Sequence, residues 1–183
     1  CGKSEELIRR LRRAEIAGQR ALVVKPLIDD RYDVGHVVSH AGAKMRSVTA
    51  QRSDEVERLA QGDDAVGIDE VQFFDDGIVD TIEALVEDGA SVVVAGLAQD
   101  FRGLPFGAMP MRARVAEFVD KLEAVCHRCG GPATMTRRLV DGEPAPFDGE
   151  VFQVGALDSY EARCRACHRV SHEDARAASS SAS

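Results

Sequence analysis

The clearest pattern in the sequence is a set of short apolar runs separated by longer segments of mixed polarity. Continuous apolar runs of roughly four to eight residues are typical of strands inside a sheet. We therefore predict strands at 21–25 (ALVVK), 65–69 (AVGID) and 91–97 (SVVVAGL). The unbroken apolar character of the third run predicts a strand that is buried on both faces. The segment 26–42, which opens with proline, is predicted to be a loop.

Between these runs, apolar residues recur at intervals of three and four, the spacing of one helix face. This spacing predicts a helix over 4–17, with Gly18 as its stop. Ser53 is the predicted N-cap of a second helix, which reaches residue 61. Two further predicted helices are marked by the apolar residues Ile78, Ile82, Leu85 and Val86, before Gly89, and by Val115, Phe118, Val119 and Leu122.

The order of these elements predicts the fold class. Strands that alternate with helices form βαβ units, and hence a parallel sheet with helices on its faces. After residue 124 the helical spacing stops, and cysteine, glycine and proline become frequent. We therefore predict an α/β domain over 1–124 and a small β module over 125–170. The tail 171–183 carries almost no apolar side chains, which predicts disorder.

Composition and charge exclude several classes of protein. The 183 residues are 44% hydrophobic and 30% charged, which is ordinary for a soluble globular protein. No apolar run approaches the roughly 20 residues that a membrane span needs. The net charge of −8 is unfavourable for a general binder of nucleic acid. A basic cluster is more simply explained as a solvated helix face than as a binding patch; it consists of Arg9, Arg10, Arg12 and Arg13.

Four of the five cysteines form two C-x-x-C pairs, at 126–129 and 164–167. No secretory signal peptide is recognisable, so we expect the reducing cytoplasm, where disulfides are rare. Each pair suits a tight turn that offers two thiolates to one tetrahedral ion. The pairs therefore predict structural zinc, with disulfides as the less favoured alternative. Because four cysteines fill such a site, we expect the neighbouring His127 and His168 at the surface.

Gly2-Lys3-Ser4 stands at the start of the first predicted helix. It matches the second half of the phosphate-binding loop G-x-x-x-x-G-K-[ST]. In that loop, backbone N–H groups hold phosphates, the lysine reaches the β- and γ-phosphates and the hydroxyl binds Mg²⁺. The first glycine would lie about five residues before Gly2, so we expect further residues, including a strand, ahead of Cys1. The alternative is an ordinary helix start.

Asp69 and Glu70 end the predicted strand 65–69. A carboxylate in this position holds Mg²⁺ in enzymes with a phosphate-binding loop, directly or through water. The adjacent Glu70 adds a second carboxylate, which is suited to act as a base. The alternative for both residues is the solubility of a strand end. The presence of Gly2-Lys3-Ser4 in the same chain favours the catalytic interpretation.

The segment 97–107 (LAQDFRGLPFG) predicts an ordered loop with aromatic anchors. Its phenylalanines, Phe101 and Phe106, could hold a nucleobase between them. Packing in a core is the more common role for such residues, and the same two interpretations apply to Tyr160. The chain has no dinucleotide fingerprint G-x-G-x-x-G and no pattern that suggests a Ser-His-Asp triad.

Taken together, these motifs resemble the type II thymidine kinase family. The matching segments occur in the family's order and span nearly the whole chain. They are GKSEELIRR at 2–10, DDRY at 29–32, GIDEVQFF at 67–74, GLAQDFRGLPFG at 96–107, the first C-x-x-C pair and VGALDSYEARCRACH at 154–168. The chain departs from the family pattern at Ala98, where many members carry an acidic residue, and at Val71, which replaces a small one.

The resemblance implies a P-loop NTPase-like α/β domain and a zinc-bearing lasso domain, assembled as a homotetramer. It also implies transfer of the γ-phosphate of ATP to the 5′-hydroxyl of thymidine, with Mg²⁺, in the cytoplasmic salvage of pyrimidine deoxynucleotides. Thymidine triphosphate (dTTP) would be a feedback inhibitor, and neither nucleic acid nor membrane would be a partner.

The resemblance also implies roles for individual residues. Glu70 would be the base, and Ser4 and Asp69 would hold magnesium. The residues implied to bind ATP and its magnesium are Gly2, Lys3, Ser4, Asp29, Asp30, Arg31, Asp69, Glu70, Val71 and Gln72. Those implied to bind the nucleoside are Leu97, Phe101, Val151, Phe152, Gln153, Val154, Gly155 and Tyr160. The zinc ligands would be Cys126, Cys129, Cys164 and Cys167.

Two other functions are kept as alternatives. The first is a kinase for another deoxynucleoside, such as deoxyuridine. The second is a non-catalytic regulator that combines a nucleotide-binding fold with a zinc ribbon. A panel of nucleosides separates the first from a thymidine kinase, and a glycine at the expected spacing ahead of Cys1 would argue against the second.

Overall fold

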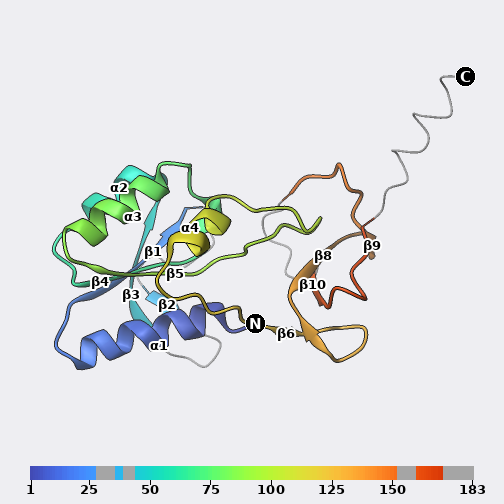
Figure 1. Ribbon diagram of the computed structural model, residues 1–183, viewed down its shortest axis with the longest axis horizontal. Coiled ribbons are helices and arrows are strands. Elements are labelled where there is room, and N and C mark those ends of the chain that lie inside the picture. Colours follow the sequence, from blue (N-terminus) through green and yellow to red (C-terminus); the bar gives the residue numbers. More distant parts are fainter. Residues whose placement is uncertain (28–35, 39–43, 152–159, 171–183) are drawn as a thin grey trace, which may run out of the picture. The chain divides into compact units, whose positions relative to one another are not determined.

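A computed structural model describes residues 1–27, 36–38, 44–151 and 160–170 of the chain (Figure 1). The chain forms two compact units. The sheet unit comprises Gly2–Ala98 and Phe106–Val119. The cysteine unit comprises Gln99–Pro105 and the chain from Asp120 onward, besides Cys1. The loop Gln99–Pro105 therefore leaves the first unit to become part of the second.

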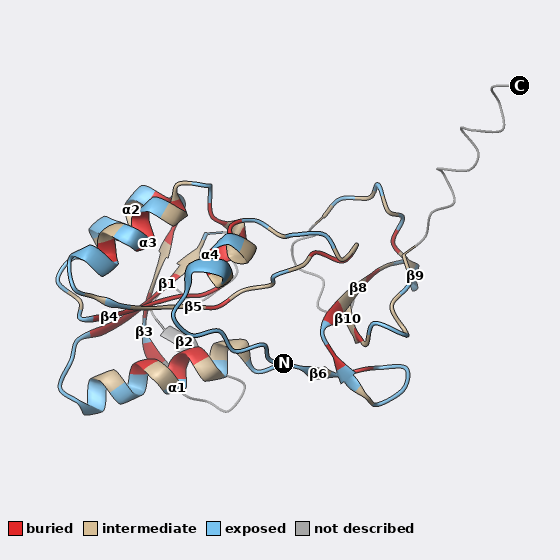
Figure 2. Ribbon diagram, viewed as in Figure 1, coloured by how far each residue is buried: buried red, intermediate tan, exposed pale blue. Residues whose placement is uncertain are grey.

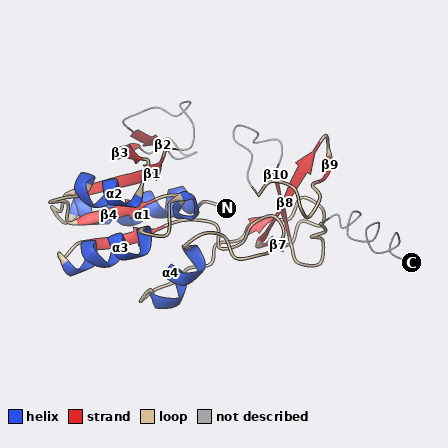
Figure 3. Cartoon of the chain, turned by 90° about the horizontal axis from the view of Figure 1, so that it is seen from above, coloured by secondary structure: helices blue, strands red, loops and turns tan. Residues whose placement is uncertain are grey.

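A parallel sheet forms the centre of the sheet unit. Its strand order is β2-β3-β1-β4-β5; β3, β1, β4 and β5 are parallel, and β2 pairs antiparallel with β3. Figure 3 shows β1 and β4 side by side within this unit. The strands are β1 (Ala21–Pro26), β2 (His36–Val38), β3 (Lys44–Ala50), β4 (Ala65–Ile68) and β5 (Ser91–Val94). The parallel α/β architecture that the sequence predicts is confirmed.

Helix α1 (Lys3–Ile16) covers one face of the sheet, as predicted to within one residue at each end (Figure 1). Its residues Leu7, Ile8 and Leu11 are buried. They lie so close to β4 that a Cβ on Gly67 would fall 2.5 Å from the Leu11 Cδ1 atom. This close approach fixes α1 against the sheet. The helix ends at Ile16, and Gly18, with a φ of +82°, supplies the predicted stop.

Helices α2 (Ser53–Leu59) and α3 (Ile78–Glu87) cover the opposite face, over the larger of the two apolar clusters (Figure 2). The predicted N-cap is wrong in detail. Ser53 is the first residue of α2, and its hydroxyl donates to Asp75 Oδ1 over 2.6 Å instead of capping its own helix. Asp75 Oδ2 accepts the Ser53 N–H over 3.0 Å. A carboxylate supplied by another loop therefore serves the start of α2.

The edges of the sheet differ from the prediction. Strand β5 is shorter than 91–97 and lies at the sheet edge, with Ser91 exposed and its valines only half-buried, so it is not buried on both faces. On the other side, the sequence shows little sign of β2 and β3. Strand β3 is polar at Ser47, which is nevertheless buried beside Val23 of β1. Because β3 has no continuous apolar run, the periodicity of the sequence does not reveal it.

The predicted helix around 115–122 is also wrong. Helix α4 (Met109–Val115) ends where that helix should begin, because Ala116 is extended, with ψ of 142°. The other short helical element, the 3-10 turn η1 (Val71–Phe73), lies earlier in the chain, before α3. Phe118 is 82% exposed, so the apolar spacing at 115, 118, 119 and 122 has no surface to pack against among the described residues. Short helices in water depend on such packing.

The cysteine unit is built from short antiparallel strands. It contains a three-stranded sheet of order β10-β8-β9 and a two-stranded pair of β6 and β7. These strands are β6 (Ala124–Val125), β7 (Pro132–Ala133), β8 (Met135–Val140), β9 (Glu143–Pro144) and β10 (Tyr160–Arg163). All five strands lie between residues 124 and 163, and the unit also includes the loop Gln99–Pro105. The tail 171–183, predicted to be disordered, lies outside the described residues.

Candidate active site and metal centre

The start of α1 places two residues of the predicted phosphate-binding loop against β4. Gly2 precedes the helix in a left-handed conformation, with φ of +77°. The next turn presents Lys3 and Ser4. The Ser4 hydroxyl donates to Asp69 Oδ2 over 2.9 Å, although 65 positions separate the two residues. The fold therefore brings together the two residues that the sequence assigns to magnesium.

Asp69 is the most deeply buried charged group of this site, with 1% of its surface exposed. Its Oδ1 atom accepts the backbone N–H of Glu70 over 3.0 Å. The Lys25 ammonium lies 3.9 Å from its Oδ2 atom. Carboxylate and hydroxyl oxygens are the ligands that a hard cation such as Mg²⁺ prefers.

Glu70 is held apart from Asp69 by its backbone. The sequence predicted a strand over 65–69 that ends at these two carboxylates. In fact β4 ends at Ile68, and Glu70 adopts a left-handed conformation with φ of +49°. Its Oε1 atom lies 3.8 Å from the Lys3 ammonium, and its Oε2 atom accepts from Gln72 Nε2 over 2.5 Å. Such a conformation is uncommon for a glutamate and is found at functional sites.

Gln72 connects Glu70 to the next loop. It is 4% exposed, and its Oε1 atom accepts the backbone N–H of Leu97 over 3.0 Å. Its two side-chain atoms therefore join a predicted catalytic residue to a residue predicted to bind the nucleoside. Val71, between Glu70 and Gln72, is fully buried in the core. Its backbone N–H donates to Ala95 O over 3.1 Å.

Lys25 was not assigned to the site from the sequence. The apolar run 21–25 was interpreted only as a strand, although a lysine closes it. A charged residue at the carboxyl end of a buried parallel strand points to the edge where ligands bind in α/β folds. That signal could have identified Lys25, whose ammonium lies beside Asp69.

Several predicted site residues lie outside the described part of the chain. In the ATP-binding set these are Asp29, Asp30 and Arg31. In the nucleoside-binding set these are Phe152, Gln153, Val154 and Gly155. Their neighbours Val151 and Tyr160 are described, and both are half-buried in the cysteine unit. Tyr160 begins β10 and pairs with Arg138 of β8.

Phe101 lies in the cysteine unit and is 3% exposed. The guanidinium carbons of Arg102 and Arg138 each lie 5.9 Å from the centre of its ring. Asp100, also buried, accepts the backbone N–H groups of Arg102 and Leu104 and pairs with the Arg102 guanidinium over 2.6 Å. The ring therefore has no open face for a base in this conformation.

Phe106 packs within the sheet unit instead. Its ring meets that of Phe73 edge to face, with the centroids 5.3 Å apart and the planes at 88°. For both phenylalanines of the segment, packing is therefore what the structure shows. The sequence did not identify Asp100 and Arg102, whose hydrogen bonds order the Phe101 loop. It could not have done so, because composition does not reveal that a carboxylate is buried.

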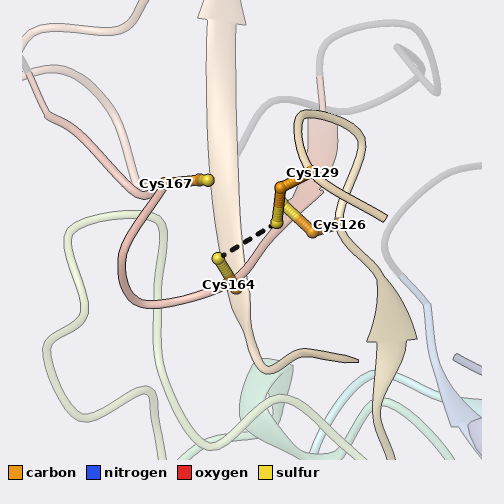
Figure 4. Close-up of side chains that lie close together, drawn as sticks. All are labelled: Cys126, Cys129, Cys164 and Cys167. Atoms are coloured by element: carbon orange, nitrogen blue, oxygen red, sulfur yellow. Dashed lines mark hydrogen bonds between the residues drawn. The ribbon is translucent and has the colours of Figure 1, made fainter. Parts of the chain in front are cut away.

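The four paired cysteines meet in the cysteine unit (Figure 4). One pair follows β6 and the other follows β10. Their four Sγ atoms lie within 4.8 Å of one another, and those of Cys129 and Cys164 are 3.7 Å apart. A tetrahedral ion bound by each sulfur at about 2.3 Å requires sulfur–sulfur distances of about 3.8 Å. The cluster is thus compatible with structural zinc.

The thiols differ in how readily they ionise. The backbone N–H of Cys164, followed by those of Cys129 and Arg128, lowers the pKa of Cys126 to about 5. A hydrogen bond with the Cys164 thiol, together with burial and the other two sulfurs, raises the pKa of Cys167 to about 12. Four thiols this close oppose one another's ionisation, and a bound cation would remove that opposition.

The two histidines beside the cysteines behave differently. His127 is 61% exposed at its side chain, as predicted. The expectation of a surface role for His168 is wrong. Its Nε2 atom lies 2.8 Å from the carbonyl oxygen of Phe101 and 3.2 Å from that of Thr136. No feature of the sequence indicates these contacts, because both partners are backbone atoms far along the chain.

Two of the four arginines in the basic cluster of α1 pair locally. Arg9 and Arg10 donate to the Glu6 carboxylate over 2.6 to 2.9 Å. These hydrogen bonds lower the pKa of Glu6 to about 2. Such pairs at spacings of three and four are typical of a solvated helix face. None of the described helices combines the length and apolar character needed to cross a bilayer.

The sheet unit therefore combines, at one edge, a helix N-terminus, a hydroxyl, two ammonium groups and two carboxylates with different partners. This set is suited to bind a polyphosphate and its metal ion and to accept a proton. The sequence profile of the thymidine kinase family matches residues 1–168. The match includes the candidate active site and the four cysteines. The chain thus belongs to the thymidine kinase family, and its activity is that of a nucleoside kinase.

Proposed function

We propose that the protein transfers the γ-phosphoryl group of ATP to the 5′-hydroxyl of thymidine and yields thymidine monophosphate. The observation that carries this proposal is the contact of Ser4 with Asp69, with Glu70 and Lys3 adjacent, in a chain of the thymidine kinase family. In this chemistry the protein has little covalent work to do. Catalysis consists mainly of positioning and neutralisation of charge.

The residues of the sheet unit divide this work. Gly2, Lys3 and the N-terminus of α1 bind the phosphates of ATP. Ser4 and Asp69 would hold the magnesium ion that accompanies these phosphates. Asp29, Asp30 and Arg31 contribute to the ATP site by family resemblance. Lys25, whose ammonium lies 3.9 Å from Asp69 Oδ2, adds positive charge beside that carboxylate.

Glu70 accepts the proton of the 5′-hydroxyl as its oxygen forms a bond to the γ-phosphorus and the bond from that phosphorus to the β,γ-bridging oxygen breaks, which releases ADP. Its Oε2 atom is oriented by Gln72, and its Oε1 atom lies near Lys3. The Lys3 ammonium lies 3.8 Å from Glu70 Oε1, and both side chains are partly exposed, so this ion pair is weak. The ammonium can therefore exchange this contact for a phosphate of ATP. General-base assistance of this kind typically contributes about 10²–10⁴-fold to the rate.

The residues proposed for the nucleoside come from the family resemblance. They are Leu97 and Phe101, together with Tyr160 and the segment 151–155. The Phe101 ring is covered in the present conformation, so stacking requires its cover to move. Zinc at the four cysteines would hold the cysteine unit together, without a part in the chemistry.

Three further properties belong to the same proposal. The protein acts in the cytoplasm, in the salvage of pyrimidine deoxynucleotides. It assembles as a homotetramer, and thymidine triphosphate is its feedback inhibitor. Each rests on the family resemblance.

A nucleoside panel tests the proposal. The purified full chain is incubated with ATP, Mg²⁺ and thymidine, deoxyuridine, deoxycytidine or deoxyguanosine, and the monophosphates are separated and quantified. We expect thymidine to have the highest kcat/KM. A higher value for deoxyuridine would favour a kinase of different preference. The absence of any monophosphate, with ATP bound, would favour a non-catalytic regulator.

A further inference from the structure

The last residue of the second cysteine turn is His168. Its backbone N–H donates to the carbonyl of Cys164 over 2.9 Å, and the N–H of Cys167 donates to the same carbonyl over 3.0 Å. These bonds make His168 part of the turn that presents Cys164 and Cys167. The position of its Cα atom is therefore set by the cysteine cluster.

The side chain of His168 extends away from this turn to two backbone carbonyls. Its Nε2 atom is 2.8 Å from Phe101 O and 3.2 Å from Thr136 O. A carbonyl oxygen only accepts hydrogen bonds, so Nε2 must carry the hydrogen and donate it. The shorter bond goes to the loop Gln99–Pro105, and the longer one goes to β8.

The loop that receives this bond is internally ordered. The Asp100 N–H donates to Leu104 O over 2.9 Å, and the Gly103 N–H donates to Asp100 O over 3.0 Å. The Asp100 carboxylate accepts two further backbone N–H groups of the loop. Because these hydrogen bonds tie the residues of the loop to one another, a bond to one of its carbonyls restrains the loop as a whole.

We propose that His168 is a positioning residue for nucleoside binding, through which the cysteine cluster fixes the Phe101 loop. The inference rests on the proposed function, since it assumes that Phe101 contacts the base. His168 touches neither substrate in this proposal. It acts by holding the Phe101 backbone where the base is to be received.

The chain contains a matched control. His127 follows Cys126 in the first cysteine turn, as His168 follows Cys167 in the second. Its side chain is 61% exposed, and its nearest charged partner, Glu161 Oε1, is 4.0 Å from Nδ1. His127→Ala therefore removes the same chemical group beside the same kind of cysteine, without touching the loop.

The experiment compares His168→Ala, His168→Gln and His127→Ala in the full chain. The glutamine side chain retains an N–H donor that can reach the position of Nε2, so the second variant serves as the conservative rescue. The measurements are zinc content, thymidine affinity by calorimetry, KM for ATP, and amide hydrogen exchange of Asp100 and Gly103. The exchange measurement needs no substrate and reports on the loop directly.

With zinc retained, His168→Ala is expected to weaken thymidine binding by about threefold to tenfold, the usual effect of one hydrogen bond. The KM for ATP should stay within about twofold, and loop exchange should accelerate. His168→Gln should restore both properties, and His127→Ala should match the wild type.

Two results would overturn the proposal. One is unchanged loop exchange and thymidine affinity in His168→Ala. The other is an equal loss for both substrates together with loss of zinc, which would make His168 part of the metal site only. If the alanine variant loses zinc, His168→Leu, which fills the space without a donor, must show the selective loss. A wild type that does not bind thymidine would refute the proposed function, while loop exchange would still test the link.

Discussion

The interiors of the two units differ in composition. The sheet unit buries two apolar clusters, one on each face of its sheet. The cysteine unit buries few apolar side chains among its described residues, and two arginines, Arg138 and Arg163, are buried with them. Those apolar residues are Phe101, Cys126, Ala133, Met135 and Ala145. A small module without a sufficient core generally needs a metal or a disulfide.

This difference has a consequence for function. The residues assigned to phosphate and magnesium lie in the unit that is stabilised by its apolar core. Phe101, which is assigned to the base, lies in the unit that depends on four cysteines, because the chain passes from one unit to the other at Ala98 and back at Phe106. Nucleoside binding and phosphate binding should therefore respond differently to loss of metal.

The largest expected effect is that of zinc removal. We expect one zinc per chain, and chelation should unfold the cysteine unit while the sheet unit keeps its structure. Thymidine binding should be lost, and ATP binding should largely persist. Metal analysis, proteolysis and calorimetry before and after chelation measure these effects.

The matched variants are Cys164→Ser, which removes a ligand, and Cys1→Ser, which removes an exposed thiol outside the cluster. Only the first should lower the zinc content. Fewer than about half an equivalent of zinc in the wild type, with all four thiols reactive, would contradict the metal assignment.

The sequence could predict the helices and strands that carry a recognisable apolar pattern within their own residues. Helix α1 and the strands β1 and β4 have continuous or periodic apolar residues, and each was located closely. Strand β3 could not be found, because it has no continuous apolar run. Its polar residue Ser47 is buried beside Val23 of β1, which the local sequence does not reveal. The predicted helix at 115–122 failed for the converse reason: its apolar spacing has no partner surface among the described residues.

The candidate site follows the same division. Lys3, Ser4, Asp69 and the cysteines belong to short motifs whose chemistry depends on spacing, so the sequence was sufficient to name them. The left-handed turn at Glu70 and the contacts of His168 depend on tertiary structure. No local pattern encodes the meeting of His168 with Phe101, which is 67 positions away.

The second prediction concerns catalysis in the sheet unit. Glu70→Gln keeps the size of the side chain and a hydrogen bond but removes the base. We expect kcat to fall by about 10²–10⁴-fold, with thymidine and ATP still bound. Steady-state kinetics with calorimetry provides the measurement, and Glu87→Gln, on the exposed end of α3, is the control. More than about a tenth of the wild-type turnover, with chemistry rate-limiting, would show that Glu70 is not the base.

The third prediction separates the stability of the two units. Leu22 of β1 is fully buried, so Leu22→Ala should lower the free energy of unfolding of the sheet unit by about 2–5 kcal/mol. The zinc content should not change. Ile16→Ala, at a residue that is 87% exposed, should have an effect near zero in the same denaturant titration. Loss of zinc in Leu22→Ala would mean that the two units do not fold independently.

The smallest expected effect involves Asp75, which joins the starts of α2 and α3. Its carboxylate accepts the hydroxyl and the N–H of Ser53 and also the N–H of Gly77. The Ser53 hydroxyl, followed by the Ser53 N–H, lowers the pKa of Asp75 below its ordinary value of 3.8. A carboxyl whose pKa is lower in the folded chain stabilises the fold above its ordinary pKa, and this contribution is lost as the pH falls through the folded value.

Asp75→Ala should therefore lower the free energy of unfolding by about 1 kcal/mol at neutral pH, as for the loss of a helix cap. The difference from the wild type should stay constant down to about pH 5 and should shrink at lower pH, as protonation of Asp75 weakens the same hydrogen bonds in the wild type. Denaturant titrations between pH 3 and 7 provide the measurement, with Asp76→Ala as the control. Because Asp75 serves only the sheet unit, zinc content should not change in either variant. A difference that grows as the pH falls would mean that the ionised carboxylate is not what stabilises the helix starts.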